Sequence, residues 1–324
     1  VGRKVLEVLE RKNLPFTEIY LVASPRSAGS KINFKGKDIT VENLETFDFS
    51  KSKITFFAAG GKISEKYAPK AAKHSFVIDN SSFYRMDPDV PLIVPQVNAD
   101  DLKNIKKNII ANPNCSTAQL VLPLKAIHDL FKIKRIIVST YQSVSGGGKG
   151  PMDELMEQTK LALENKEINS KNFTKQISFN LIPHIDVFAD DGYTKEELKM
   201  TNETKKILDQ NIELSATCVR VPVMVSHSEA VNLELEKNFT LDQIRECIEK
   251  TESCKVIDER ADGGYSTPLE AAGKDETFIS RIRGDKTKKN CLNMWIVSDN
   301  LLRGAALNAV EIAETLIKND FHGK

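Results

Sequence analysis

The segment Asn112-Pro113-Asn114-Cys115-Ser116-Thr117 places a cysteine where a thiol can become a nucleophile. It follows the apolar run 109–111, which is typical of a strand, and precedes the apolar run 118–127, which is typical of a helix. We therefore expect Cys115 in the first turn of a helix, where unpaired N–H groups and the helix dipole stabilise a thiolate. A free cysteine is more commonly a buried structural residue, but the polar turn formers around Cys115 favour a reactive one.

A histidine in the second half of the chain is the natural partner for this thiol. His227 lies between two strand-like segments and is flanked by Ser226 and Ser228. Such a position suits an imidazole that presents one nitrogen to a substrate. A histidine in a turn is usually only solvated, so the hypothesis depends on Cys115 as the other half of a nucleophile and base pair.

Charged side chains that could bind a substrate lie on two other elements. Arg220 alternates with valines in an expected strand, which suits a carboxylate or phosphate ligand, although an edge salt bridge is equally compatible. Glu196 and Lys199 share one face of an expected helix, a spacing that usually gives only a surface ion pair.

Small and hydroxyl-bearing residues at the ends of expected strands indicate a dinucleotide-binding site. Ser24-Pro25-Arg26-Ser27 follows the expected strand 19–23, and an arginine with hydroxyls there accommodates a 2′-phosphate, which favours NADP over NAD. The alternative is a plain turn. Gly60-Gly61 and Ser145-Gly146 could let the backbone approach a cofactor, but glycine-rich turns are common.

Composition narrows the class of protein. The 324 residues, 40% hydrophobic, are enough for two domains, and 46 basic against 45 acidic residues give no support for a nucleic-acid or membrane partner. Five scattered cysteines suggest neither a disulfide framework nor a metal site. No apolar stretch approaches the roughly 18 residues of a spanning helix. We expect a cytoplasmic protein.

The order of elements predicts an α/β chain. Strands at 19–23, 54–58, 76–78, 92–94 and 108–111 alternate with helices, as in a parallel sheet covered on both faces, and an α+β domain follows. We expect a dinucleotide-binding domain from 1–113 with 299–324, and a second domain from 114–298. Val1-Gly2 would be the end of a glycine-rich cofactor turn whose strand is missing from the chain.

In combination, several segments resemble the aspartate-β-semialdehyde dehydrogenases over nearly the whole chain. The segments that carry the resemblance are 23–29, 79–82 with 85–91, 112–117, Tyr141-Gln142 with Ser145-Gly146, 182–186, 196–199, 220–230 and 298–300 with 304–306. The resemblance implies a Rossmann-type domain joined to an α+β catalytic and dimerisation domain, as in glyceraldehyde-3-phosphate dehydrogenase, and a homodimer.

The resemblance also implies roles for individual residues. Cys115 would form the acyl-enzyme, His227 would be the general acid/base, and Gln142 would orient the reacting group. The implied substrate ligands are Arg220 and Glu196 for the amino-acid end and Arg85, Lys199 and Asn114 for phosphate. The implied NADP ligands are Arg26 and Ser27 beside Ser24, the turns at Val1, Gly2, Gly60 and Gly61, and Ser145, Gly146 and Asn300 near the nicotinamide.

The implied reaction is the NADPH-dependent reductive dephosphorylation of L-aspartyl-4-phosphate to L-aspartate-4-semialdehyde through a cysteine thioester. It belongs to the biosynthesis of lysine, threonine, methionine and diaminopimelate. Two alternatives stay open: an N-acetyl-γ-glutamyl-phosphate reductase, and a catalytically silent dinucleotide-binding subunit. A free substrate ammonium needs a carboxylate such as Glu196, whereas an acetamide does not.

Overall fold

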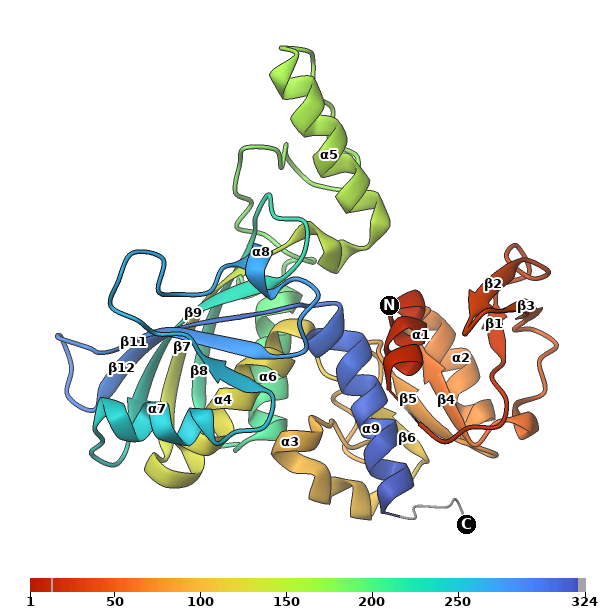
Figure 1. Ribbon diagram of the computed structural model, residues 1–324, viewed down its shortest axis with the longest axis horizontal. Coiled ribbons are helices and arrows are strands. Elements are labelled where there is room, and N and C mark those ends of the chain that lie inside the picture. The colour runs from red at the N-terminus through yellow and green to blue at the C-terminus, as the bar shows by residue number, and fades with distance from the viewer. Residues whose placement is uncertain (13, 320–324) are drawn as a thin grey trace. The chain divides into compact units, whose positions relative to one another are not determined.

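The computed structural model describes residues 1–12 and 14–319, which form two compact units (Figure 1). The first unit holds Val1–Pro95, Ala99–Asn112 and the chain from Ala306, and the second holds Gln96–Asn98 and Pro113–Ala305. Residues 299–305, which we expected in the first domain, cluster with the second unit. Their side chains explain this, because Asn300 and Arg303 hydrogen-bond within that unit.

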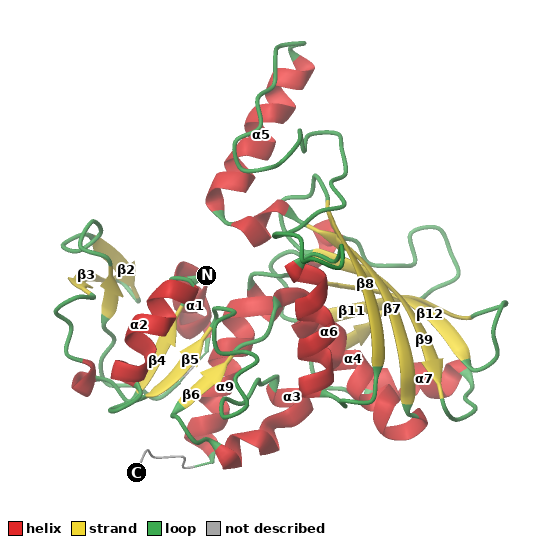
Figure 2. Ribbon diagram, turned by 180° about the vertical axis from the view of Figure 1, so that it is seen from behind, coloured by secondary structure: helices red, strands yellow, loops and turns green. Residues whose placement is uncertain are grey.

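The first unit contains a parallel sheet of the expected kind. Its strands are β4 (Ile54–Phe57), β5 (Phe76–Asp79) and β6 (Ile109–Ala111), with β5 in the middle. Helices α2 (Gly61–Ala71) and α9 (Leu307–Lys318) pack on β5, whose apolar residues are largely buried (Figure 2). Helix α1 (Gly2–Arg11) packs against α9.

A second small sheet in this unit was only partly predicted. Strand β1 (Leu21–Ala23) pairs in parallel with β3 (Lys37–Asn43), and β3 forms a hairpin with β2 (Lys31–Phe34). The hairpin turns at Lys35-Gly36, both with positive φ, and its polar strands gave no apolar signal. The strand expected at 92–94 is wrong, because Leu92 makes only one isolated bridge, to Ala111.

The second unit is built on a six-stranded mixed sheet in the order β10-β11-β12-β9-β7-β8. The strands are β7 (Ile133–Gln142), β8 (Glu213–Arg220), β9 (His227–Leu235), β10 (Cys254–Val256), β11 (Thr277–Gly284) and β12 (Cys291–Ser298). Helices α4 (Cys115–Phe131), α6 (Lys195–Ile207) and α7 (Leu241–Glu249) pack on the sheet and bury one apolar core with it (Figure 2).

The remaining helices of the described residues are shorter or lie apart from this core. Helix α5 (Lys149–Leu163) extends away from the sheet of its unit (Figure 1). The others are α3 (Pro95–Asn98), α8 (Pro268–Ala271), the 3-10 turns Phe49–Lys51, Ala99–Asn104 and Val144–Gly147, and the π-helical segment Leu302–Ala306. No helix in the described part of the chain is both long and apolar enough to cross a membrane.

Candidate active site

Cys115 is the first residue of α4, as its sequence context predicts. Asn114 caps the helix, and its side-chain oxygen accepts hydrogen bonds from the N–H groups of Ser116 at 3.0 Å and Thr117 at 3.4 Å. The thiol is half-buried and lies at the positive end of a 17-residue helix. This location favours the thiolate over the thiol.

Two buried glutamates from α6 hold the cap residue itself. The Asn114 backbone N–H donates to Glu203 at 2.6 Å, and its side-chain amide donates to Glu196 at 2.9 Å. Glu196 and Glu203 are seven residues apart and therefore lie on one helix face. Sequence reasoning missed Glu203, because charged residues at helical spacing normally mark a solvated face.

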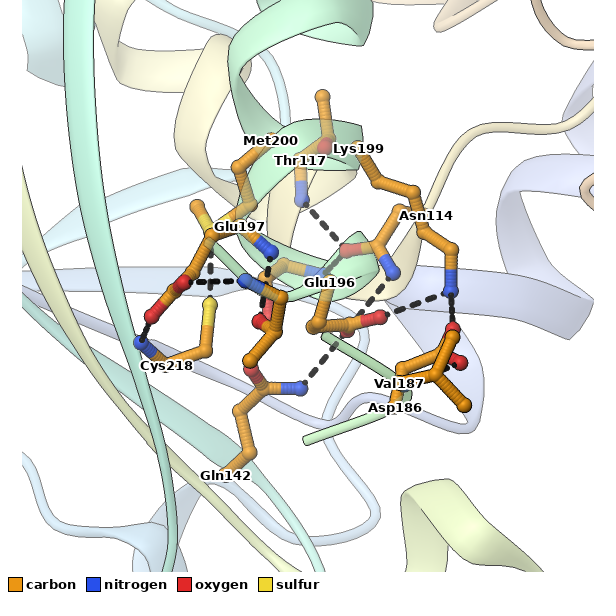
Figure 3. A network of polar contacts seen from close by, with 12 residues as sticks. Asn114, Thr117, Gln142, Asp186, Val187, Glu196, Glu197, Lys199, Met200 and Cys218 are labelled. Atoms are coloured by element: carbon orange, nitrogen blue, oxygen red, sulfur yellow. Dashed lines mark hydrogen bonds and ion pairs between the residues drawn. The ribbon is translucent and has the colours of Figure 1, made fainter. Parts of the chain in front are cut away.

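Glu196 is the centre of a network of polar contacts (Figure 3). The side-chain amides of Asn114 and Gln142 both donate to its Oε1, and the Lys199 ammonium lies 3.0 Å from its Oε2. Burial alone would raise the pKa of Glu196, but Lys199 and the amide donors hold it at about 2. The carboxylate is therefore ionised at neutral pH although the residue is only 5% exposed.

Lys199 bridges Glu196 to a second carboxylate. Its ammonium lies 2.7 Å from Asp186 Oδ2, as well as 3.0 Å from Glu196 (Figure 3). Burial lowers the pKa of Lys199, but the two carboxylates outweigh it and raise the value overall. The spacing of Glu196 and Lys199, which usually gives only a surface ion pair, here belongs to a triad of the buried Glu196, the half-buried Lys199 and the exposed Asp186.

Arg220, the last residue of β8, carries a guanidinium with most of its donors unused. Nη1 donates to the Ser143 carbonyl at 2.7 Å, and no ion pair forms with it among the described residues. Burial lowers the pKa of Arg220, and the charges of Glu196 and Cys115 act in the opposite direction. The edge salt bridge considered for this residue is absent from the described part of the chain, which leaves the guanidinium available for an anion.

His227, the first residue of β9, is completely buried. Its Nδ1 accepts a hydrogen bond from the Ser143 backbone N–H at 3.0 Å, whereas its Nε2 contacts no partner among the described residues. A Cβ added to Gly146 would lie 3.0 Å from Arg220 Nη1 and 3.2 Å from His227 Nε2. The imidazole and the guanidinium thus border the same space, which the glycine keeps open.

The other residues expected near the nicotinamide form a compact cluster. The Asn300 side-chain oxygen accepts from the Ser145 hydroxyl at 3.0 Å, the Ser143 hydroxyl at 3.1 Å and the Ser226 N–H at 2.9 Å. These contacts leave only the Asn300 amide nitrogen for a ligand. The cluster holds Ser226, the residue that precedes His227.

Four other cysteines differ from Cys115 in their surroundings. Burial raises the pKa of Cys218 and Cys291, that of Cys247 to about 11 and that of Cys254 to about 12. These thiols stay protonated at neutral pH, and none lies at a helix N-terminus. Cys115 therefore remains the candidate nucleophile.

The first unit holds the remaining predicted residues. Arg85 is buried, and its guanidinium donates to the Asn112 carbonyl at 2.9 Å and the Asn80 carbonyl at 3.1 Å. Gly60, with φ +90°, caps α2, and Gly61 is its first residue. Gly2 lies beside Ala58, with 4.0 Å between a Cβ added there and the alanine Cβ.

The turn after β1 carries the residues that we predict for a 2′-phosphate. The Ser24 carbonyl accepts from the backbone N–H groups of Ser27 at 2.9 Å and Ala28 at 3.1 Å, which closes a tight turn. The exposed Arg26 side chain has no hydrogen bond or ion pair among the described residues. Arg26, Ser27 and Ser24 therefore present donors to solvent.

Known proteins with similar sequences decide the family. Residues 1–105 match the NAD binding domain of semialdehyde dehydrogenase, and residues 124–303 match its dimerisation domain. The chain is 51% identical to the aspartate-semialdehyde dehydrogenase of Aquifex aeolicus, over 98% of this chain and 95% of that protein. The chain belongs to the aspartate-semialdehyde dehydrogenase family.

Other aspartate-semialdehyde dehydrogenases agree in sequence and structure. The Campylobacter jejuni protein is 48% identical over 97% of this chain and 93% of its own length. The crystal structure of aspartate semialdehyde dehydrogenase II from Vibrio cholerae, complexed with ASA, matches with a TM-score of 0.96 and 44% identity, over 98% of this chain and 95% of that one. The predicted fold, a Rossmann-type domain with a dimerisation domain, is confirmed, and the chain is an oxidoreductase of this family.

Proposed function

We propose that this chain converts L-aspartyl-4-phosphate to L-aspartate-4-semialdehyde through a thioester on Cys115, with NADPH as the reductant. The observation that carries the proposal is the position of the Cys115 thiol at the first turn of α4. The preceding residue, Asn114, donates to the buried ionised carboxylate of Glu196, and the charge of Cys115 acts on the Arg220 guanidinium, which borders the same space as the His227 imidazole. Membership of the aspartate-semialdehyde dehydrogenase family supports the substrate.

The amino-acid end of the substrate requires one anionic and one cationic group. Glu196 supplies a carboxylate that is ionised at neutral pH, which suits a free ammonium. Arg220 supplies a planar guanidinium with unused donors, which suits a carboxylate. A buried ionised carboxylate would be costly beside the acetamide of an N-acetyl substrate, and this favours the aspartyl substrate over the N-acetylglutamyl one.

The phosphate and the acyl carbon need further contacts. We assign Lys199 and Asn114, together with Arg85, to the phosphate, and Gln142 to the orientation of the reacting group. The Lys199 ammonium lies beside Glu196, so that it can neutralise charge on both the Glu196 carboxylate and the phosphate. We assign His227 the role of general acid/base for the reacting group.

NADP(H) is the cofactor that the first unit fits best. The free Arg26 guanidinium beside the hydroxyls of Ser24 and Ser27 suits a 2′-phosphate. The Gly60-Gly61 turn at the N-terminus of α2, and Val1-Gly2 at that of α1, offer backbone N–H groups to phosphate oxygens. Ser145, Gly146 and Asn300 are assigned to the nicotinamide half. When bound, the cofactor supplies a hydride. An aspartate-semialdehyde dehydrogenase from Candida albicans, 25% identical, has been crystallised with NADP.

The same family is the basis for proposing an oligomeric state and a biosynthetic role. We propose a homodimer, because the dimerisation domain of this family spans residues 124–303. The sheet of the second unit leaves Ile137 and Tyr141 of β7 partly exposed on a face that a second copy could cover. The proposed role is in the cytoplasmic biosynthesis of lysine, threonine, methionine and diaminopimelate.

The proposed reaction is tested in reverse. The purified chain should reduce NADP⁺ when given L-aspartate-4-semialdehyde and inorganic phosphate. Cys115→Ala should abolish turnover, whereas the matched control Cys254→Ala should retain it. Without phosphate, mass spectrometry should find an aspartyl adduct on Cys115.

Two results would redirect the proposal. Faster turnover of N-acetylglutamate semialdehyde would identify an N-acetyl-γ-glutamyl-phosphate reductase. The absence of turnover with both aldehydes, without protection of Cys115 from alkylation by NADP⁺, would indicate a silent subunit.

A further inference from the structure

One amide side chain links the helix of Cys115 to two strands of the sheet. Gln119 lies one turn after Cys115 on α4, on the same side of the helix, and is completely buried. Its Nε2 donates to the His227 carbonyl of β9 at 3.2 Å, and its Oε1 accepts from the Ser298 hydroxyl of β12 at 3.3 Å. The amide therefore joins three elements of the second unit through both of its polar atoms.

The two groups that Gln119 contacts belong to one row of residues across the sheet. Ser298 and His227 are partners across β12 and β9. His227 pairs in turn with Gln142 of β7, and Gln142 pairs with Arg220 of β8. The side chains that we assign to the reaction on these strands thus lie at one level of the sheet, and Gln119 is bound to that level from α4.

Apolar packing alone does not explain a buried glutamine at this place. Neighbouring residues of α4, such as Leu120 and Leu124, are apolar and completely buried. A hydrogen bond within a protein adds only about 0.5–1.5 kcal/mol of net stability, and an apolar side chain also gains from burial. Hydrogen bonds are directional, however, whereas apolar contacts are not. The amide therefore fixes how α4 sits on β9 and β12 more closely than an apolar side chain would.

Glu229 is a second buried polar group near this amide. It lies two residues after His227 and on the same face of β9, and neither of its carboxyl oxygens has a hydrogen-bond partner among the described residues. Burial raises the pKa of Glu229 well above its usual value, and Gln119 acts against this rise. The uncharged carboxyl group is thereby favoured, and it is a weaker acceptor than a carboxylate. The Gln119 N–H group accordingly stays on the His227 carbonyl.

We propose that Gln119 is a positioning residue for the reaction, because its amide holds the first turn of α4, and with it the Cys115 thiol, against the row of the sheet that carries His227. Gln119 acts through the His227 backbone and takes no part in bond making or proton transfer. The charge of Cys115 raises the pKa of Arg220 in the same row, so the thiol and the row already interact. This role rests on the proposed function and adds a residue that neither the sequence pattern nor the family resemblance indicates.

The test removes the link from either end. Gln119→Leu can neither donate nor accept, and Ser298→Ala removes only the donor to Oε1. A misplacement of about 1 Å can cost roughly 10²-fold in rate, so in the reverse assay we expect Gln119→Leu to lose about tenfold or more in kcat, with little change in KM. Ser298→Ala should lose about threefold, the value of one weak hydrogen bond. The double variant should be no slower than Gln119→Leu, because both substitutions break the same link.

His128→Leu is the matched control on the same helix. His128 is buried near the other end of α4, where its Nδ1 accepts from the Ile133 N–H of β7 at 3.2 Å. This substitution also removes a hydrogen bond between α4 and a strand, but 13 residues from Cys115. We expect His128→Leu to lower the melting temperature and to leave kcat unchanged.

Alkylation of Cys115 by iodoacetamide, measured against pH, tests the link without turnover. In Gln119→Leu the midpoint should move to higher pH, because a looser helix end holds the thiolate less closely to the Arg220 charge. A Gln119→Leu variant that melts lower but keeps the wild-type kcat and midpoint would overturn the proposal. If that variant fails to fold, Ser298→Ala decides by the same two measurements, and wild-type values in both would overturn it. A wild type without turnover, whose midpoint still shifts in Gln119→Leu, would count against the proposed function and not against the link.

Discussion

A glycine almost two hundred residues away in the sequence packs directly against the nucleophile. A Cβ added to Gly304 would lie 2.5 Å from the Cβ of Cys115 and 2.8 Å from its Cα. Carbon atoms in contact normally stay about 3.5–4.0 Å apart. Because the obstructed atoms are the Cβ and backbone of Cys115, no change of rotamer can relieve the clash. We therefore predict that Gly304→Ala displaces the first turn of α4, or the π-helical segment that carries residue 304, by about 1 Å.

This displacement should affect catalysis more than folding. A misplacement of about 1 Å can cost roughly 10²-fold in rate, and overpacking typically costs about 1–3 kcal/mol of stability. The assay is kcat/KM in the reverse direction, with the alkylation rate of Cys115 and the melting temperature measured on the same samples. Gly284→Ala is the matched control, because an added Cβ there meets nothing within 4 Å.

One pattern of results would refute this reasoning. If Gly304→Ala and Gly284→Ala had the same kcat/KM and the same alkylation rate as the wild type, the packing of residue 304 on Cys115 would not position the thiol. A folded Gly304→Ala variant with slow alkylation and slow turnover would support it.

Two buried carboxyl groups give opposite pH dependences of stability. The pKa of Glu196 falls from 4.5 to about 2 on folding, so its contribution of about 3 kcal/mol is complete above pH 4.5 and is lost as the pH falls towards 2. In urea unfolding, the free energy of unfolding should fall less between pH 5 and pH 3 in Glu196→Gln than in the wild type. Equal decreases in the two proteins would exclude this contribution of Glu196. Burial raises the pKa of Glu229 well above 4.5, with Gln119 opposing, so the folded protein loses stability as the pH rises above 4.5. Glu229→Gln should remove that loss, and the free energy of unfolding at pH 8 relative to pH 5 should rise; an unchanged difference would contradict the expectation.

The position of the nucleophile could be predicted because it is encoded locally. The apolar strand, the Pro113-Asn114 turn and the apolar helix around Cys115 are contiguous, so their periodicity alone indicates the junction. The roles of His227 and Arg220 were weaker predictions, since taken alone His227 also fits a solvated histidine and Arg220 an edge salt bridge. The prediction that these residues share one site came from the resemblance to a family and not from their spacing in the sequence.

The parts that could not be predicted depend on contacts that are distant in the sequence. Glu203 is 89 residues from Asn114, and nothing in its helical spacing distinguishes it from an acid on a solvated helix face. The approach of Gly304 to Cys115 likewise depends on the folded chain. The polar hairpin of β2 and β3 lacks an apolar pattern, because most of its residues are not buried.

The chemistry of the cap explains why an asparagine precedes the nucleophile. Serine, aspartate and asparagine cap helices about equally well, so capping alone does not select among them. Asn114 must accept from two N–H groups of α4 with its side-chain oxygen and donate to Glu196 with its side-chain nitrogen. Serine has a single hydroxyl in place of these two atoms, and aspartate would bring a carboxylate against Glu196 and close to Glu203. Asparagine satisfies both demands without charge, so the residue that holds Cys115 at the helix end also links the thiol to the carboxylate assigned to the substrate's ammonium.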